Sequence, residues 1–203
     1  MIDASIRRLI DPPLAHAGQL LAAAGISADA VTIGGCLIGL AAALAASVGQ
    51  FYIALALLIA NRVADGLDGA IARVTRHTDR GAFLDITLDF LVYAAMPLGF
   101  AAWRPDANAF PAAFLLASFV ANGSAFLAFS ILAEKRGMRT TGQGHKSIYY
   151  LAGIAEGFET IVFMGAFCLF PSSFTILALI FATLCWISAV GRLALGWKLL
   201  NRN

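Results

Sequence analysis

The sequence is short of charged residues. Only 13% of its 203 residues are Asp, Glu, Lys or Arg, whereas 60% are hydrophobic. A soluble domain usually carries roughly a quarter of charged residues. The shortage of charge, together with long apolar runs, therefore excludes an ordinary soluble domain and indicates an integral membrane protein. The net charge is only +2, and no nucleic-acid partner is expected.

Cysteine is scarce as well, and no signal peptide is expected. The three cysteines lie in apolar runs without a CxxC spacing, which favours small core or lipid-facing residues over disulfides or metal ligands. Arg7 and Arg8 are followed by Asp11 and two prolines rather than by the apolar segment of a signal peptide. Residues 1–27 form a Pro-interrupted amphipathic stretch, which we expect to lie as a short helix on the membrane surface.

Six apolar segments are long enough to cross a membrane. A helix needs about 20 predominantly apolar residues to do so. The sequence therefore predicts an all-α integral membrane fold, in which residues 28–203 form a six-helix transmembrane domain. The predicted spans are residues 28–48, 51–73, 81–103, 110–133, 147–170 and 172–197.

Nearly all basic residues at the ends of these spans or between them fall on one side of the membrane under this assignment, and only Arg104 clearly falls on the other. Because basic residues concentrate in cytoplasmic loops, both termini are expected in the cytoplasm. The residues on this side are Arg7, Arg8, Arg73, Arg76, Arg80, Lys135, Arg136, Arg139, Lys146, Lys198 and Arg202.

Four aspartates interrupt the second and third spans. Asp65 and Asp68 are spaced i, i+3, and Asp85 and Asp89 are spaced i, i+4, so each pair shares one face of a helix. An ionised residue inside a membrane helix is costly and is functional by default. Asp68 and Asp85 lie about one to two turns from the 74–80 connection, so the two pairs sit at a similar depth near the cytoplasmic interface. Brought together, the two faces offer only oxygen ligands, which suit hard divalent cations.

The pattern from Asp65 to Asp89, D-x2-D-G-x2-A-R-x7-G-x3-D-x3-D, resembles the signature of the CDP-alcohol phosphatidyltransferase family at every fixed position. Six transmembrane helices after an amphipathic N-terminus are also the plan of that family. Residues 25–32 resemble its G-[IL]-[ST]-P-N-x-[LV]-T motif, except that Ala28 replaces Pro and Asp29 replaces Asn. The resemblance implies a membrane enzyme that moves a phosphatidyl group from a CDP-linked lipid, such as CDP-diacylglycerol, to a polar alcohol and releases CMP.

The resemblance also implies roles for individual residues. Asp65, Asp68 and Asp85 would hold two divalent cations, Mg²⁺ or Mn²⁺. Asp89 would share in metal binding or, as we favour, take the proton from the acceptor hydroxyl as general base. A homodimer is expected on the same ground. The nucleotide would contact Asp68, Gly69, Ala72, Arg73, Gly81 and Thr32, which combine small side chains with a phosphate-binding arginine.

Taken singly, these residues have simpler explanations. One membrane aspartate often forms an interhelical hydrogen bond, although four at these spacings are harder to explain in that way. Gly69 and Gly81 are equally consistent with close helix packing. Arg73 alone fits the cytoplasmic bias of basic residues, and Thr32 alone fits a hydroxyl bonded within its own helix.

The acceptor alcohol is left open by the sequence. Residues 133–137 resemble an A-E-x-x-G run of the family, which in members using sugar or glycerol phosphates is commonly followed by arginines at the start of the fifth helix. Here His145 and Lys146 stand there instead, which weakens a phosphorylated acceptor without excluding it. Glycerol 3-phosphate or an inositol-type polyol is the expected acceptor. Taken singly, each basic residue of the loop is better explained by the general enrichment of basic residues in cytoplasmic loops. The candidate basic residues are Lys135, Arg136, Arg139, Lys146 and Arg192.

Two acidic residues of the fifth span, Glu156 and Glu159, are further acceptor candidates because they share a helix face at functional depth. They would contact hydroxyl or ammonium groups, which would favour a polyol or an amino alcohol such as serine. Alternatively, they pair with Arg192 or Arg62, and ion pairing is slightly preferred. Asn61 and Arg62 either support the metals or form an ion pair with a motif aspartate.

A cation transporter is the alternative from another class, because it also places acidic residues in membrane helices. It requires carboxylates near the bilayer midplane and a path to both faces. Residues 51–59 and 90–100, which form the other halves of the second and third spans, are nearly uncharged. An enzyme is therefore favoured over a transporter.

Overall fold

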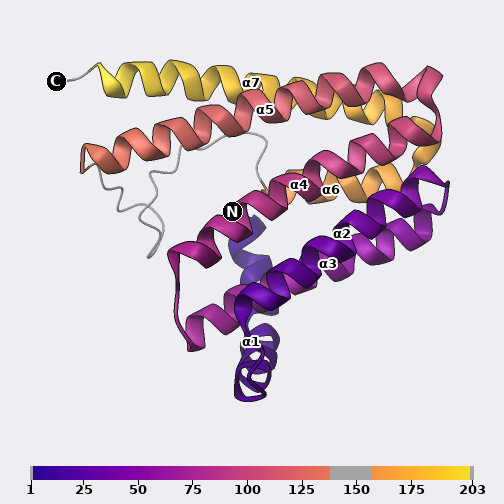
Figure 1. The fold of residues 1–203 in the computed structure, drawn as a ribbon. Helices are drawn as coiled ribbons and strands as arrows, with labels where there is room; N and C mark the ends of the chain where they lie inside the picture. The colour runs from indigo at the N-terminus through magenta and orange to yellow at the C-terminus, as the bar shows by residue number, and fades with distance from the viewer. Residues whose placement is uncertain (1, 138–156, 202–203) are drawn as a thin grey trace.

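The computed structural model describes residues 2–137 and 157–201, with side chains from residue 12 onward. All regular elements in these two ranges are helices, as the sequence predicted (Figure 1). They are α1 (Ile2–Ala23), α2 (Ala28–Ser47), α3 (Phe51–Val74), α4 (Asp79–Trp103), α5 (Pro105–Lys135), α6 (Gly157–Leu169), the 3₁₀ turn η1 (Pro171–Ser173) and α7 (Phe174–Leu200).

Capping residues explain where several helices begin. Ser27 accepts a hydrogen bond from the Ala30 N–H at 3.2 Å and thereby starts α2. Thr78 caps α4 in the same way, so this helix begins two residues earlier than predicted. Pro105 occupies the first turn of α5, where its missing N–H costs nothing, and this helix begins five residues earlier than predicted.

The structure supports the prediction that the protein spans the membrane, but it does not establish the number of spans. Four of the described helices are long and apolar enough to cross a membrane, namely α2, α4, α5 and the combined η1–α7 segment. The α3 helix is long enough but contains both Asp65 and Asp68, and α6 is described over only 13 residues. The protein is therefore an integral membrane protein, whereas the count of six spans stays a prediction.

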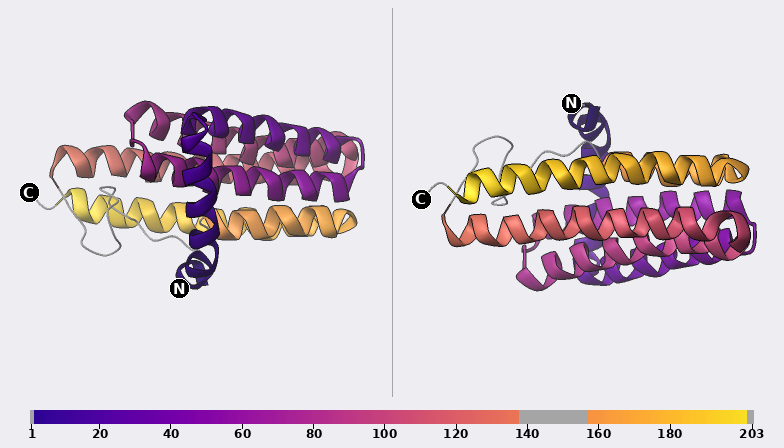
Figure 2. Two further views of the ribbon diagram at one scale, coloured as in Figure 1. Left: turned by 90° about the horizontal axis from the view of Figure 1, so that it is seen from below. Right: turned by 90° about the horizontal axis from the view of Figure 1, so that it is seen from above.

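The N-terminal segment forms one helix, α1, although Pro12 and Pro13 lie inside it. A helix was predicted in this segment, and the structure shows that it continues through both prolines. Figure 2 shows that α1 runs crosswise to the remaining helices. It packs on α3, where an added β-carbon at Gly18 would collide with Ala70. Its placement on a membrane surface stays a prediction.

The remaining helices run roughly along one axis in alternating directions (Figures 1 and 2). The α2 helix packs on α3 and α4, α5 packs on α7 and α4, and α6 packs on α3 and α7. The α3–α4 connection and the C-terminus lie at one end of the bundle, and the α2–α3, α4–α5 and α6–α7 connections lie at the other (Figure 1). We call the first the aspartate end because Asp68 and Asp85 lie beside the α3–α4 connection.

An aromatic cluster fills the bundle near the opposite end. Phe100 from α4 stacks on Phe174 from α7 with ring centroids 4.8 Å apart, and Phe167 from α6 lies edge-on to Phe174 at 4.9 Å. Farther along α7, Phe181 stacks on Phe163 at 4.5 Å. Phe100, Phe167, Phe174 and Phe181 are fully buried. This cluster joins α4, α6 and α7 into a dry core.

The α2 and α4 helices approach each other closely at Gly99. A β-carbon added at Gly99 would overlap the backbone carbonyl oxygen of Ala43. Only glycine therefore allows α4 to lie this close to α2. The contact fixes the spacing of two of the three helices that line the pocket described below.

Gly99→Ala is accordingly expected to destabilise the protein by about 1–3 kcal/mol, because the added methyl group forces α2 and α4 apart. In an unobstructed helix the same change stabilises by roughly 0.5–1 kcal/mol. Gly34→Ala is the matched control, since an added β-carbon there meets no atom within 4 Å. Thermal unfolding in detergent measures both variants. A Gly99→Ala protein as stable as Gly34→Ala would contradict the close approach.

Candidate active site

The last turns of α3 and the first turns of α4 bring the two aspartate pairs together. The Thr78 hydroxyl accepts a hydrogen bond from the Gly81 N–H at 3.0 Å, which fixes the start of α4. Asp85 and Asp89 then fall within about three turns of that start. Asp65 and Asp68 lie on the neighbouring stretch of α3, as the spacing predicted.

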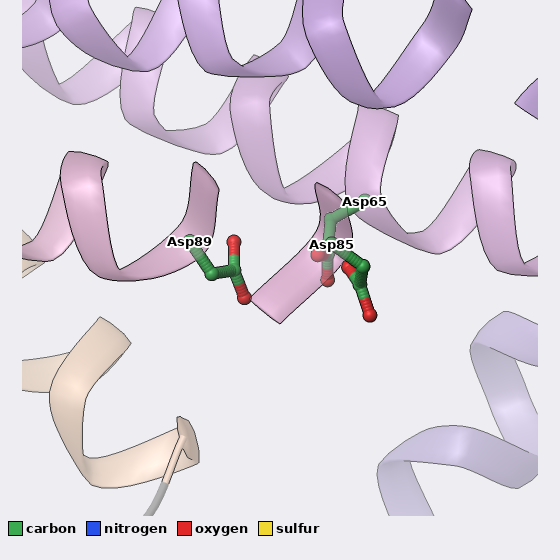
Figure 3. A group of neighbouring side chains, drawn as sticks. All are labelled: Asp65, Asp85 and Asp89. Carbon is green, nitrogen blue, oxygen red and sulfur yellow. The ribbon is translucent and has the colours of Figure 1, made fainter. Parts of the chain in front are cut away.

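A pocket opens among α2, α3 and α4 at the aspartate end. One carboxylate oxygen from each of Asp65, Asp85 and Asp89 lies within 4.8 Å of the other two. Figure 3 shows these three side chains, from α3 and α4, directed into the same open region. The pocket is lined by Thr32, Gly35, Cys36, Asn61, Asp65, Asp68, Asp85, Leu88 and Asp89.

Asp68 lines the same pocket but is fixed by α2. Its Oδ2 accepts a hydrogen bond from the Thr32 hydroxyl at 2.6 Å, and the residue is only 7% exposed. Thr32 also lies 3.0 Å from the Ala28 carbonyl oxygen within its own helix. The sequence left open whether Thr32 bonds only inside α2, and the structure shows that it contacts a motif aspartate as well.

Asp89 is paired with Arg62. The Arg62 Nη2 donates to Asp89 Oδ1 at 2.7 Å, while Asp65 Oδ2 lies farther away, 3.8 Å from Arg62 Nη1. Of the two roles considered for Arg62, the structure thus shows an ion pair with a motif aspartate. Tyr93 joins the pair, because its hydroxyl donates to Asp89 Oδ2 at 3.2 Å. Sequence reasoning missed Tyr93, although its i+4 spacing from Asp89 was a signal.

The other predicted nucleotide contacts lie beside the pocket rather than in its lining. Gly69 is half-buried, and an added β-carbon there would meet only Arg73. Arg73 itself is exposed at the end of α3, and Ala72 is half-buried. A β-carbon at Gly81 would lie 3.2 Å from Asp29, whose carboxylate pairs with Arg80 at 2.5 Å. None of Gly69, Ala72, Arg73 and Gly81 is therefore part of the pocket lining.

The comparison that decides the family covers most of the chain. The family model described as CDP-alcohol phosphatidyltransferase matches residues 26–197, a range that contains the whole pocket. The chain belongs to this family. It is therefore a membrane transferase of phospholipid biosynthesis, as the aspartate pattern indicated.

Two relatives in this family resemble the chain over different lengths. The inner membrane protein YnjF of Escherichia coli (strain K12) is 42% identical over 201 residues, which is 99% of this chain and 98% of that protein. The archaetidylinositol phosphate synthase of Pyrococcus horikoshii (strain ATCC 700860 / DSM 12428 / JCM 9974 / NBRC 100139 / OT-3) is 37% identical over 97 residues, 47% of this chain and 52% of that protein.

Crystal structures of the phosphatidylinositol phosphate synthase PgsA1 of Mycobacterium tuberculosis share the fold. The form with CDP-DAG bound has a TM-score of 0.72 and 22% identity, and the alignment covers 91% of this chain and 94% of that chain. The form in complex with manganese and citrate has a TM-score of 0.71 and 24% identity, with coverage of 91% and 89%. The helix arrangement is therefore that of this transferase family.

None of the acceptor candidates that the structure describes lies in the pocket lining. Lys135 and Arg136 are exposed at the end of α5, where the Arg136 Nη1 donates to the Leu200 carbonyl oxygen at 2.6 Å. Arg192 is 9% exposed in α7, and its guanidinium carbon lies 5.1 Å from the centre of the Phe126 ring. Glu159 is half-buried near the start of the described part of α6. Arg139, Lys146 and Glu156 lie outside the described residues.

The donor atoms of the pocket fit the divalent cations that this family would require. Asp65, Asp85 and Asp89 each offer a carboxylate oxygen within a span of 4.8 Å. Carboxylate oxygens are the ligands that hard cations such as Mg²⁺ and Mn²⁺ prefer. The oxygens come from α3 and α4, which both pack on α2.

Proposed function

We propose that this transferase moves the phosphatidyl group of CDP-diacylglycerol, or a similar CDP-linked lipid, to an inositol-type polyol and releases CMP. The observation that supports this proposal is the convergence of Asp65, Asp85 and Asp89 in a pocket that also contains Asp68. Four carboxylates suit a site that binds a pyrophosphate together with cations. The family match supplies the reaction class.

In this proposal the residues of the pocket have different roles. Asp65, Asp68 and Asp85 hold two divalent cations, and Thr32 keeps the Asp68 carboxylate in place through its 2.6 Å hydrogen bond. When bound, such cations neutralise the pyrophosphate oxygens and stabilise the leaving CMP. Arg73 binds a phosphate at the pocket mouth, where Gly69 leaves room for the nucleotide.

Asp89 has a different role, because it accepts the proton of the acceptor hydroxyl. The oxygen of that hydroxyl forms a bond to the phosphorus that bears the lipid, and the bond from this phosphorus to the CMP oxygen breaks. The proton passes to a carboxylate oxygen of Asp89 as the new bond forms. The base lines the pocket beside Asp65 and Asp85, within reach of a substrate held there.

An inositol-type acceptor is supported by the kind of relatives that the chain has. One is named an archaetidylinositol phosphate synthase, and the fold is shared with a phosphatidylinositol phosphate synthase. Arg192, which lies buried in α7, is a candidate for binding the polar acceptor. Serine or another amino alcohol is the runner-up acceptor, and Glu159 would then contact its ammonium group.

We place the aspartate end in the cytoplasm, together with both termini. The described basic residues of α3, α4, α5 and α7 cluster at this end, and Arg104 lies at the other, which agrees with the cytoplasmic bias of basic residues. A location in the inner membrane is supported by the relative YnjF, which is named an inner membrane protein. The proposal includes six spans, α1 on the membrane surface, and a homodimer.

The described fold also argues against a cation transporter. Transport requires a polar path that continues from the carboxylates to the opposite membrane face. In the described bundle this route meets the aromatic cluster of Phe100, Phe167 and Phe174, which is fully buried and apolar. The pocket therefore suits chemistry with substrates that enter and leave from one end.

A CMP-release assay with CDP-diacylglycerol tests the proposal. The purified protein is supplied with Mg²⁺ or Mn²⁺ and with inositol, inositol 1-phosphate, glycerol 3-phosphate, serine or ethanolamine as single acceptors. We expect CMP release only with an inositol compound, and loss of all release after chelation with EDTA. Release with serine alone would replace the acceptor in the proposal. No release with any of these acceptors would contradict the proposed reaction.

A further inference from the structure

The Asp89 carboxylate is held on both of its oxygens by groups that stand outside the pocket lining. The Arg62 Nη2 donates to Oδ1 at 2.7 Å, and the Tyr93 hydroxyl donates to Oδ2 at 3.2 Å. The Arg62 Nη1 lies 3.5 Å from Oδ2 and donates to the Tyr93 hydroxyl at 3.1 Å. Asp89 lines the pocket, whereas Arg62 and Tyr93 do not. Arg62 and Tyr93 therefore hold the Asp89 carboxylate by hydrogen bonds without themselves lining the pocket.

The guanidinium of Arg62 is itself fixed by its neighbours. Its Nε donates to Asn61 Oδ1 at 2.8 Å, and Asn61 Nδ2 donates to the Gly35 carbonyl oxygen at 2.8 Å. Asn61 is only 3% exposed. The Arg62 guanidinium carbon also lies 5.4 Å from the centre of the Tyr93 ring. One chain of contacts thus runs from the α2 backbone through α3 to Asp89 and Tyr93 on α4.

The positive charge of Arg62 lies closer to Asp89 than to the Asp65 carboxylate. Arg62 lies 2.7 Å from Asp89 but 3.8 Å from Asp65, while Asp68 is bonded to the neutral Thr32. The Arg62 side chain is 12% exposed, so water screens its charge only weakly. At these distances the positive charge of Arg62 disfavours a divalent cation beside Asp89 more than one beside Asp65.

We propose that Arg62, anchored by Asn61 and assisted by Tyr93, is a positioning residue that reserves the Asp89 carboxylate for the acceptor hydroxyl and directs cations to the other three aspartates. This inference rests on the proposed function, because it assumes that Asp89 is the proton acceptor. It assigns roles to Arg62, Asn61 and Tyr93 that the sequence pattern of the family does not include. A planar guanidinium suits the task, because it can engage a carboxylate with two N–H groups.

Arg62→Gln tests the inference through two readouts that should move in opposite directions. The kcat for CMP release is expected to fall by about 10- to 100-fold, the usual effect of losing a residue that orients a functional group. The KM for CDP-diacylglycerol should change little. Electron paramagnetic resonance on the substrate-free protein should show Mn²⁺ binding tightened at least about threefold, because a neighbouring positive charge is removed. A merely structural role for Arg62 would weaken both properties together.

Arg62→Lys and Tyr93→Phe separate the effect of the Arg62 charge from the effects of its geometry and of the Tyr93 hydrogen bond. Lysine keeps the charge but lacks the two-pronged geometry, so Mn²⁺ affinity should stay at the wild-type level while kcat falls less than in Arg62→Gln. Tyr93→Phe keeps the ring and removes one hydrogen bond to Asp89. It should lower kcat several-fold, on the order of the loss of one such bond, with Mn²⁺ affinity unchanged. This variant keeps the inference testable if Arg62→Gln does not fold.

Arg104→Gln is the matched control. Arg104 also stacks on an aromatic ring, 5.3 Å from the centre of the Trp103 ring, but at the opposite end of the bundle. Its substitution should change neither kcat nor Mn²⁺ affinity. Wild-type kcat in Arg62→Gln, or weaker Mn²⁺ binding together with lower kcat, would overturn the inference. Failure of the wild-type protein to release CMP with any acceptor would instead count against the proposed function.

Discussion

Asp89→Asn is expected to abolish CMP release while leaving much of the binding of metal and CDP-diacylglycerol intact. The substitution removes the oxygen that would accept the acceptor's proton and changes the shape of the side chain very little. Loss of a general base lowers turnover by roughly 10²- to 10⁴-fold. Release of CMP is measured under saturating substrates, and Mn²⁺ binding is measured on the same preparation without substrate.

Asp106→Asn serves as the control for this variant, since Asp106 is an exposed carboxylate in the first turn of α5, at the other end of the bundle. It should retain wild-type turnover. Full turnover by Asp89→Asn would remove Asp89 from the base role. Complete loss of Mn²⁺ binding in that variant would assign Asp89 to the metal ligands instead.

Asp65→Ala and Asp85→Ala should each lose the Mg²⁺-dependent binding of CDP-linked nucleotide. Each deletes a carboxylate whose oxygen lies within 4.8 Å of two others, and the remaining oxygens are too few to hold two cations. We expect the affinity for Mn²⁺ to fall at least about tenfold, because even residues that only orient metal ligands contribute 10- to 100-fold. Isothermal titration with CDP, with and without Mg²⁺, measures the effect.

The control for the metal ligands is Asp79→Ala. Asp79 is an exposed carboxylate at the start of α4, and it is not part of the pocket lining. This variant loses the same charge from the helix that carries Asp85. Because Asp79 lies outside the pocket lining, metal-dependent binding of CDP should be preserved. Unchanged binding in Asp65→Ala or Asp85→Ala would contradict their assignment as ligands.

The sequence predicted the helical fold class and the family, because both follow from one-dimensional patterns. Apolar runs report helices that cross a membrane, and the fixed spacing between Asp65 and Asp89 reports two adjacent helices. Helix ends were predicted less well. Thr78 and Pro105 start α4 and α5 earlier than the apolar runs suggested, since capping depends on local hydrogen bonds rather than on hydropathy.

The partners of the aspartates could be predicted only as alternatives. Sequence spacing showed that Arg62 lies one turn before Asp65, but the side chain reaches across to Asp89 on another helix. Likewise, Thr32 on α2 lies 36 residues from Asp68 and yet contacts it. Such contacts depend on the packing of α2 against α3 and on side-chain rotamers, neither of which periodicity determines.

The buried phenylalanines between α4, α6 and α7 have a consequence for the cell. Phe100, Phe167 and Phe174 fill the described part of the bundle beyond the carboxylates. Under the proposed mechanism, the proton taken from the acceptor would therefore leave by the end of the bundle at which the acceptor entered. The four aspartates would then serve the chemistry without carrying protons from one face of the bilayer to the other.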